Sequence, residues 1–229
     1  MLNGTEKIGN SPSKYARAQN ILANYSQSIK EKAQVIYNPI PPLSRIELEG
    51  DDFGYFGGMS YLKGFEVLRR ALTLLKNTSI KVYATNFSHL QAIKLADSLQ
   101  KLGIVLYGRL ERDEHPELYR KIRAVLVPSI VPETWSYVVT EAILRGRIVV
   151  ASKIGGIPEQ ARGCKGVILF EPKDFRGLAE KIEYISSLPR EKVSDLGAQN
   201  RETFLTNFSP EKPLTDFSEL CNRLLENSK

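Results

Sequence analysis

Residues 124–152 read AVLVPSIVPETWSYVVTEAILRGRIVVAS, and the pattern of this stretch decides the fold. The runs AVLV (124–127) and IVVAS (148–152) are short and almost wholly apolar, as strands buried on both faces of a sheet are. Between them, residues 136–145 have helical spacing, and Gly146 supplies a helix stop. A buried strand, a helix and a second buried strand predict a unit with two parallel strands.

The same alternation continues on both sides of this unit. Apolar runs predict further strands at 53–58, 80–85, 104–108 and 166–170, with helices between them and at about 174–187, 190–204 and 210–226. In the helix predicted at 88–101, Leu90, Ile93, Leu95 and Leu99 form the apolar face. We therefore predict an α/β fold: a single Rossmann-like, doubly wound parallel sheet with an N-terminal helical arm and C-terminal helices.

The ends of the chain differ from this central region. Residues 12–30 have the spacing of an amphipathic helix, Val35–Tyr37 read as a short strand, and a proline cluster at 39–42 favours a stiff linker. We divide the chain into a helical arm with its linker (1–45), a Rossmann-like domain that contains the candidate ligand-binding loops (46–208) and a C-terminal helix (209–229).

The net charge is +6, and residues 1–45 hold six basic residues against two acidic ones. A solvated helix face and a basic surface that contacts a membrane or a partner both explain this excess. No aromatic-basic motif of a known nucleic-acid module is present, so we expect no nucleic-acid partner. Two cysteines and the absence of an apolar leader favour a cytoplasmic location, with the arm at the inner membrane face as an alternative. His89 and His115 lack the spacing of metal ligands, so we expect no metal site.

In parallel sheets of this kind, ligands bind in the loops that follow the strands. In the loop GGMSYLKG (57–64), Gly57 and Gly58 let the backbone approach an anion, and Lys63 lies where a helix begins. A tight turn beside a solvated lysine explains the same residues. In GRLERDEHPE (108–117), Arg109 and Leu110 could form the bottom of a pocket for a base. The loop SKIGGIPE (152–159) has the pattern of an ordinary helix start.

The loop PETWSYVVTEA (132–142) carries the sharpest signal. Backbone amides at the helix start can bind phosphate oxygens. Glu133 precedes that start, and Glu141 lies about a turn and a half inside the helix among apolar residues, which indicates burial. Two carboxylates would repel a phosphate, so we expect them to accept hydrogen bonds from hydroxyl groups on either side of it. That arrangement suits a nucleotide sugar. The alternative is that Glu133 lies in a solvated turn and Glu141 on an exposed helix face, with no ligand between them.

Taken in order, these segments resemble the donor-binding half of retaining family 4 glycosyltransferases of the GT-B fold. The matching pieces run from about residue 53 to residue 187: YFGGMSYLKGFEVLRRAL, LYGRLERDEHPELYRKIRAVLVPS, ETWSYVVTEA, RGRIVVASKIGGIPE and GVILFEPKDFRGLAEKI. The resemblance implies a metal-independent, hexosyltransferase-like enzyme without cofactors, in which the leaving phosphate helps to deprotonate the acceptor. It also implies a role for each matching residue: Glu133 and Lys63 are catalytic, and the donor is bound by Gly57, Gly58, Lys63, Arg109, Leu110, Glu133, Thr134, Trp135, Ser136, Tyr137, Val138 and Glu141.

Within that set, Glu141 would hold the ribose hydroxyls, Glu133 the sugar hydroxyls, and Lys63 with the amides of residues 136–138 the diphosphate. This chain has Gly57-Gly58 where the family usually has Gly-Arg, so one phosphate-neutralising cation is missing. Only one of the two Rossmann-like halves of a GT-B enzyme is present, so a partner subunit, a homodimer or the arm would supply the acceptor side.

We therefore expect a glycosyltransferase that transfers a sugar, with retention, from a nucleotide-diphosphate sugar to a sugar, lipid or protein acceptor. A catalytically incompetent nucleotide-sugar-binding or regulatory subunit is one alternative. A related GT-B enzyme, such as a sugar-nucleotide epimerase, is another.

Overall fold

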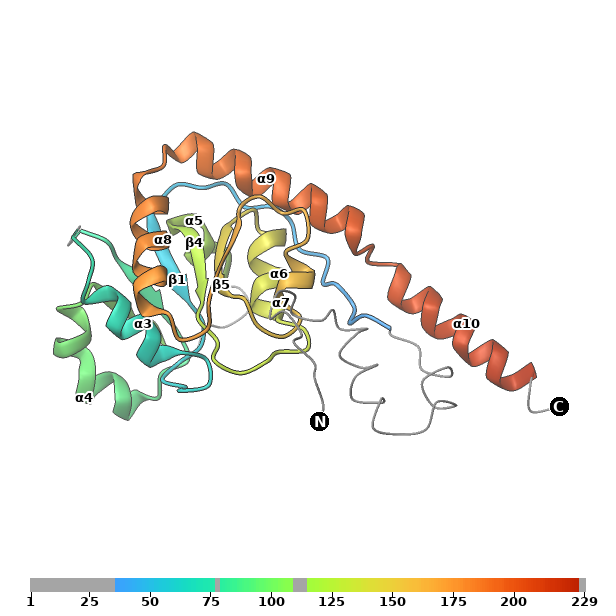
Figure 1. Cartoon of the computed structure of the whole chain (residues 1–229), viewed down its shortest axis with the longest axis horizontal. Helices are drawn as coiled ribbons and strands as arrows, with labels where there is room; N and C mark the ends of the chain where they lie inside the picture. Colours follow the sequence, from blue (N-terminus) through green and yellow to red (C-terminus); the bar gives the residue numbers. More distant parts are fainter. Residues whose placement is uncertain (1–35, 77–78, 109–114, 227–229) are drawn as a thin grey trace, which may run out of the picture.

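Six parallel strands form one sheet in the computed structural model, which describes residues 36–76, 79–108 and 115–226. The order across the sheet is β3-β2-β1-β4-β5-β6 (Figure 1). The strands are β1 (Asp52–Tyr55), β2 (Val82–Ala84), β3 (Ile104–Leu106), β4 (Ile122–Val127), β5 (Ile148–Ser152) and β6 (Val167–Phe170). The order reverses direction between β1 and β4, which is the switch point of a doubly wound sheet. The predicted fold class is confirmed.

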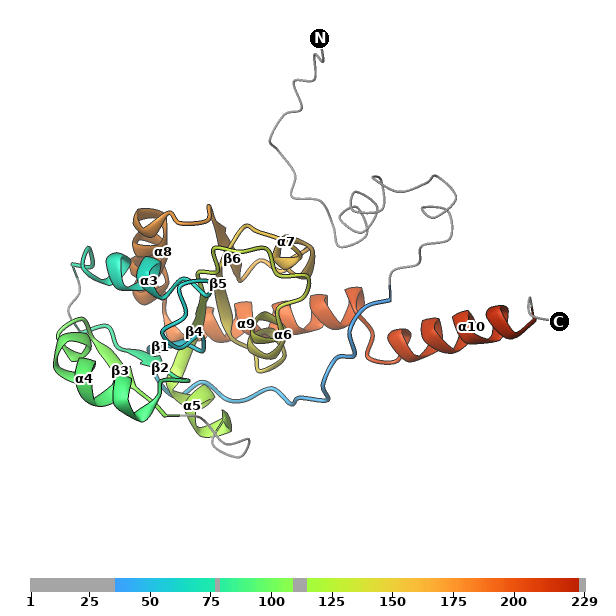
Figure 2. The same cartoon turned by 90° about the horizontal axis from the view of Figure 1, so that it is seen from below.

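Helices cover both faces of the sheet. They are α3 (Phe65–Leu72), α4 (His89–Gln100), α5 (His115–Lys121), α6 (Tyr137–Leu144), α7 (Ile157–Gln160), α8 (Phe175–Ser187), α9 (Arg190–Asn207) and α10 (Lys212–Glu226). Helices α3 and α8 pack together on one face, and α6 and α9 pack together on the other (Figures 1 and 2). Helix α10 extends away from the sheet in both views.

The central strands divide their side chains between two hydrophobic clusters. In β4, Ala124 and Leu126 join the cluster under α3 and α8, whereas Val125 and Val127 join the cluster under α5, α6 and α9. This alternation follows from the two-residue period of a strand. Because both faces are buried, residues 124–127 have no polar positions, and this apolar run made the strand recognisable from sequence.

A buried arginine fixes α5 relative to the segment that enters the sheet. Arg147 is 1% exposed, and its guanidinium donates to the carbonyls of Tyr119 (2.8 Å), Ile46 (2.9 Å) and Glu47 (2.9 Å). Burial lowers the pKa of Arg147 to about 10. Five carbonyl contacts in all satisfy the donors of the buried charge, so the end of α5 is held firmly against residues 46–47.

One prediction about local structure is wrong and another is half right. The strand predicted at Val35–Tyr37 does not form in its described residues, Ile36 and Tyr37; prolines follow at 39, 41 and 42, and the Tyr37 ring packs against Trp135 and Phe208. Helix α4 forms where predicted, and Leu95 and Leu99 of its predicted apolar face pack on the core, but Leu90 and Ile93 are 60% and 64% exposed. The predicted helix at 12–30 and most of the basic arm lie outside the described residues.

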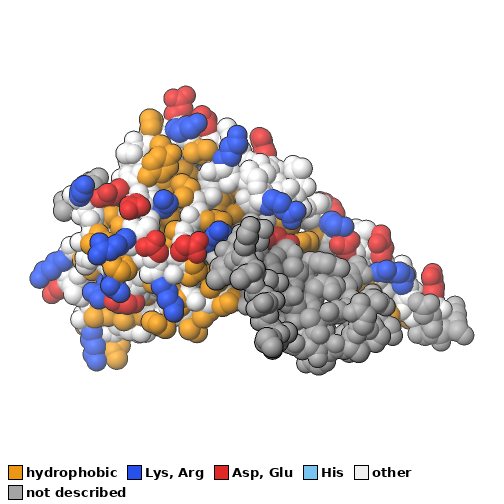
Figure 3. All heavy atoms as spheres, viewed as in Figure 1, with side chains coloured by type: hydrophobic (Ala, Val, Ile, Leu, Met, Phe, Trp, Pro, Cys, Tyr) orange, Lys and Arg blue, Asp and Glu red, His pale blue; other side chains and the backbone are white. Residues whose placement is uncertain are grey.

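The surface of the described residues carries charges of both signs. On the face shown in Figure 3, basic and acidic side chains alternate over α3, α8 and α9 without forming a single-sign patch. Within the described part of the chain, none of the helices combines the length and the apolar composition that crossing a bilayer requires.

Candidate functional site

Two adjoining cavities lie at the carboxyl ends of the strands near the switch point. The smaller has a volume of about 40 Å³ and contains Lys63 and Glu133 in its wall. The larger has a volume of about 180 Å³ and contains Glu141. Phe56 and Val138 line both cavities, so the cavity that contains Glu133 and the cavity that contains Glu141 are neighbours.

An ion pair lies at the mouth of the smaller cavity. The Nζ atom of Lys63 is 3.1 Å from Oε1 of Glu133, and the two side chains are 49% and 13% exposed. The hydroxyl of Ser129, which is fully buried, donates a hydrogen bond to the same oxygen. An ion pair with one half-exposed partner is worth roughly 0–1 kcal/mol. Lys63 can therefore exchange this partner for a more strongly charged anion at little cost.

Close backbone packing at the start of α3 places Lys63 beside Glu133. Gly64, the N-cap of α3, has a φ of 78°, and a Cβ at this position would lie 1.8 Å from the carbonyl oxygen of Pro128. Only glycine permits both the left-handed conformation and this approach. The start of α3 consequently lies against the loop that follows β4, within reach of the Glu133 carboxylate.

The loop SKIGGIPE (152–159) packs against the backbone of Glu133. Gly155 has a φ of 62°, and a Cβ there would lie 2.4 Å from the carbonyl oxygen of Glu133. The amide of Gly156 donates to that same oxygen at 2.7 Å. This loop therefore has the structural role that its sequence favoured, and it fixes the backbone that carries the carboxylate.

The N-terminus of α6 is partly paired within the fold. Ser136 is the N-cap, and its amide donates to Oε1 of the buried Gln160 at 2.9 Å. In return, Nε2 of Gln160 donates to the Ser136 carbonyl and to the Thr140 hydroxyl, each at 3.0 Å. The amides of Tyr137 and Val138, at the first turn, have no partner within the helix. Of the three amides predicted to bind phosphate, Ser136 is thus already engaged.

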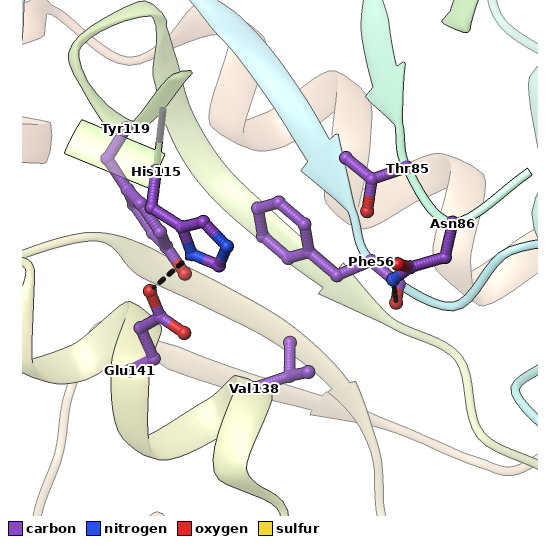
Figure 4. A pocket seen from close by; sticks show the side chains of 7 residues that line it. All are labelled: Phe56, Thr85, Asn86, His115, Tyr119, Val138 and Glu141. Atoms are coloured by element: carbon purple, nitrogen blue, oxygen red, sulfur yellow. Dashed lines mark hydrogen bonds and ion pairs between the residues drawn. The ribbon is translucent and has the colours of Figure 1, made fainter. Parts of the chain in front are cut away.

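The larger cavity brings together α5, α6 and the loops after β1 and β2 (Figure 4). The Nδ1 atom of His115 is 3.0 Å from Oε1 of Glu141, and the two side chains are 30% and 25% exposed. The apolar residues beside Glu141 in the sequence predicted that it would be buried, but its side chain is partly exposed. Burial, followed by the negative charge of Glu141, raises the pKa of the Tyr119 phenol well above its usual range, so that this side chain stays neutral.

The remaining predicted residues lie in different places. Gly57 lines the smaller cavity, and the Gly58 amide is paired with the Thr85 carbonyl at 3.1 Å. The Trp135 ring is buried in an aromatic cluster, and neither Trp135 nor the exposed Thr134 lines either of the two adjoining cavities. Arg109 and Leu110 lie outside the described residues.

Several cavity residues were missed at the level of sequence. They are Phe56, Thr85, Asn86, His115, Tyr119 and Ser129. Phe56 and the pair Thr85-Asn86 directly follow β1 and β2, so the rule that ligands bind after strands could have found them. In contrast, His115 and Glu141 meet only through the packing of two helices, and nothing in the local sequence signals their contact.

The strand order 3-2-1-4-5-6, with cavities at the switch point, defines a Rossmann-like, doubly wound domain, a class of fold in which ligands bind at this edge of the sheet. Residues 50–187 match the family model described as "Glycosyl transferases group 1", and the chain belongs to this family of glycosyltransferases.

Two curated relatives align with 69% of this chain. One is an uncharacterized glycosyltransferase of Methanocaldococcus jannaschii, 26% identical over 180 residues, and 46% of its length is covered. The other is an uncharacterized protein of the cps region of Klebsiella pneumoniae, 24% identical over 165 residues, with 42% of its length covered. The chain therefore spans less than half the length of these relatives.

Solved structures share the fold at low sequence identity. The Anabaena protein HepE in complex with UDP-glucose superposes with a TM-score of 0.75 at 20% identity, covering 93% of this chain and 63% of that one. The sucrose-phosphate synthase of Thermosynechococcus elongatus superposes with a TM-score of 0.72 at 19% identity, covering 95% and 58%.

Proposed function

We propose that this chain binds a nucleotide-diphosphate sugar and acts as the donor half of a retaining, metal-independent glycosyl transfer. One observation carries the proposal: Glu133 and Glu141 line adjoining cavities that share Val138, in the first turn of α6. The two carboxylates can accept hydrogen bonds from hydroxyl groups, and the amides of Tyr137 and Val138 can donate to phosphate oxygens. This combination supports a ligand that joins a ribose, a diphosphate and a sugar.

Each part of the donor then has a partner. The ribose hydroxyls donate to Glu141 in the larger cavity, and Arg109 and Leu110 contact the base. The amides of Tyr137 and Val138, together with Lys63, bind the diphosphate, since the positive end of a helix favours an anion. The hydroxyls of the transferred sugar donate to Glu133 in the smaller cavity.

The chemistry follows from this placement. The bond between the anomeric carbon and the leaving phosphate oxygen breaks as the acceptor oxygen bonds to that carbon on the same face. The departing phosphate takes the acceptor proton, so no separate protein base is required. Lys63 leaves its pair with Glu133 and stabilises the charge that develops on the phosphate. Glu133, held by Ser129, keeps the sugar oriented.

The acceptor and its binding surface are a separate part of the proposal. Whether the acceptor is a sugar, a lipid or a protein, its binding surface would come from a second copy, a partner subunit or sequence beyond the matched region. The alternative function, a donor-binding regulatory subunit, uses the same cavities without turnover.

Donor binding is tested by calorimetric titration with UDP, GDP and ADP and with their glucose conjugates. We expect the nucleotides of one base to bind most tightly. Lys63→Met should lower the affinity for the nucleoside diphosphate about 10- to 100-fold and leave the affinity for the corresponding nucleoside unchanged. Lys153→Met is the matched control, because Lys153 lies beside Glu171, 3.8 Å away, and lines neither cavity. Equal binding by the wild type and Lys63→Met would overturn the assignment of Lys63.

Turnover is tested by following release of free sugar or transfer to simple acceptors, with and without a chelator. Tight donor binding without transfer or hydrolysis would favour the regulatory alternative. Loss of activity on chelation would contradict the metal-independent mechanism. Inverted product stereochemistry would contradict retention.

A further inference from the structure

We propose that His115 is a positioning residue for ribose recognition: it fixes the Glu141 carboxylate so that the second oxygen receives the ribose hydroxyls. The inference rests on the donor site proposed above and adds a residue to it. It also names a property of the site, namely discrimination between nucleotides with and without ribose hydroxyls.

The contact itself is specific. Nδ1 of His115 is 3.0 Å from Oε1 of Glu141, a hydrogen-bond distance. Figure 4 shows the imidazole directed at one carboxylate oxygen, while the other oxygen is turned toward Val138 at the cavity wall. An ionised carboxylate only accepts hydrogen bonds, so the proton of this contact lies on Nδ1 of His115. One oxygen is thus engaged by the protein and the other faces the site.

The two helices that carry this pair are themselves held in place. Tyr119, one turn along α5 from His115, is 1% exposed, and its carbonyl accepts from the buried Arg147. On α6, Thr140 is fully buried beside Glu141, and its hydroxyl accepts from Gln160. The bond between His115 and Glu141 therefore connects two helices that are each anchored by buried hydrogen bonds, so it can orient the carboxylate before a ligand binds.

Orientation matters because the 2′- and 3′-hydroxyls of ribose form a closely spaced pair of donors. A carboxylate that rotates freely loses rotamer entropy when it accepts both, whereas a carboxylate already held by His115 loses less. Removing the imidazole should consequently weaken the binding of a ribonucleotide and leave the binding of a 2′,3′-dideoxynucleotide unchanged. A role of His115 in folding alone would affect both ligands equally.

The experiment compares UDP, GDP and ADP with their 2′,3′-dideoxy counterparts by calorimetric titration. For His115→Leu we expect the affinity for the ribonucleotide to fall on the order of tenfold, with no change for the dideoxynucleotide. His115→Asn keeps an amide donor near the position of Nδ1 and should retain most of the affinity. Glu117→Ala, an exposed position on the same helix with a side chain 70% exposed, is the control and should change neither.

A double-mutant cycle tests whether His115 acts through Glu141. In a Glu141→Ala background, His115→Leu should have no further effect on either ligand. The inference is overturned if His115→Leu weakens both ligands equally, if it leaves the ribonucleotide unaffected, or if its effect persists without Glu141. If the wild type binds none of the nucleotides, the proposed donor site fails, and the inference fails with it.

Discussion

The support of α6 by Gln160 yields a prediction whose size follows from the structure. Gln160 is fully buried, and its amide group makes three hydrogen bonds to Ser136 and Thr140, at 2.9, 3.0 and 3.0 Å. Substitution by methionine keeps the length of the side chain and removes all three bonds. The Ser136 amide is then left buried without an acceptor.

Each neutral hydrogen bond contributes about 1 kcal/mol net, and a buried donor left unpaired costs about 1–3 kcal/mol. We expect Gln160→Met to lower the free energy of unfolding by about 3–5 kcal/mol, which a domain of ordinary stability tolerates. Because the first turn of α6 is then less well fixed, the affinity for a nucleoside diphosphate should fall as well.

Urea denaturation at constant m-value measures the loss, and a nucleotide titration at low temperature measures the effect on binding. Gln199→Met is the matched control: it makes the same change at an exposed position of α9 and should stay within about 0.5 kcal/mol of the wild type. A loss of less than 1 kcal/mol in Gln160→Met would refute the reasoning, because it would mean that the three bonds do not hold the helix start.

Three further outcomes are expected. Ser129→Ala removes the hydroxyl that orients Glu133 and should lower kcat about tenfold with little change in the KM for the donor, as steady-state kinetics would show. Gly155→Ala should destabilise the fold by at least about 1–3 kcal/mol in urea titrations, because its φ of 62° and the nearby Glu133 carbonyl leave no room for a Cβ. A hydrogen bond from Arg190, with a further contribution from Arg123, lowers the pKa of Asp51, so the stability that it contributes is present above the unfolded pKa of about 3.9 and is lost as the pH falls below it. Between pH 7 and pH 2.5, Asp51→Asn should therefore show a smaller decrease in melting temperature than the wild type, and an identical decrease would contradict this.

Most of the sheet could be predicted from sequence because its strands are buried on both faces. The runs at 124–127 and 148–152 contain no polar interruption apart from the final serine, and the structure places both in interior strands of the sheet, β4 and β5. Val35–Tyr37 has a similar local composition but forms no strand in its described residues, Ile36 and Tyr37. The difference is tertiary: the Tyr37 ring packs against both Trp135 and Phe208, and such long-range contacts have no signature in the local sequence.

Only part of the candidate site could be predicted from the sequence, for a related reason. Glu133 and Glu141 could be found because both lie in one loop and helix after a strand, where ligands bind in this fold. Residues that modify them come from elsewhere in the chain. Gln160 reaches the Ser136 amide across 24 positions, and His115 reaches Glu141 across 26. Local patterns report periodicity and turns, whereas these contacts depend on how α5, α6 and α7 pack.

The most direct measurement is a crystal structure of the chain with the nucleotide-diphosphate sugar that binds best in the titrations. We expect the ribose hydroxyls within hydrogen-bond distance of Glu141, diphosphate oxygens at the amides of Tyr137 and Val138, and the sugar hydroxyls at Glu133. A ligand bound outside the two adjoining cavities, or a diphosphate remote from the first turn of α6, would contradict the account.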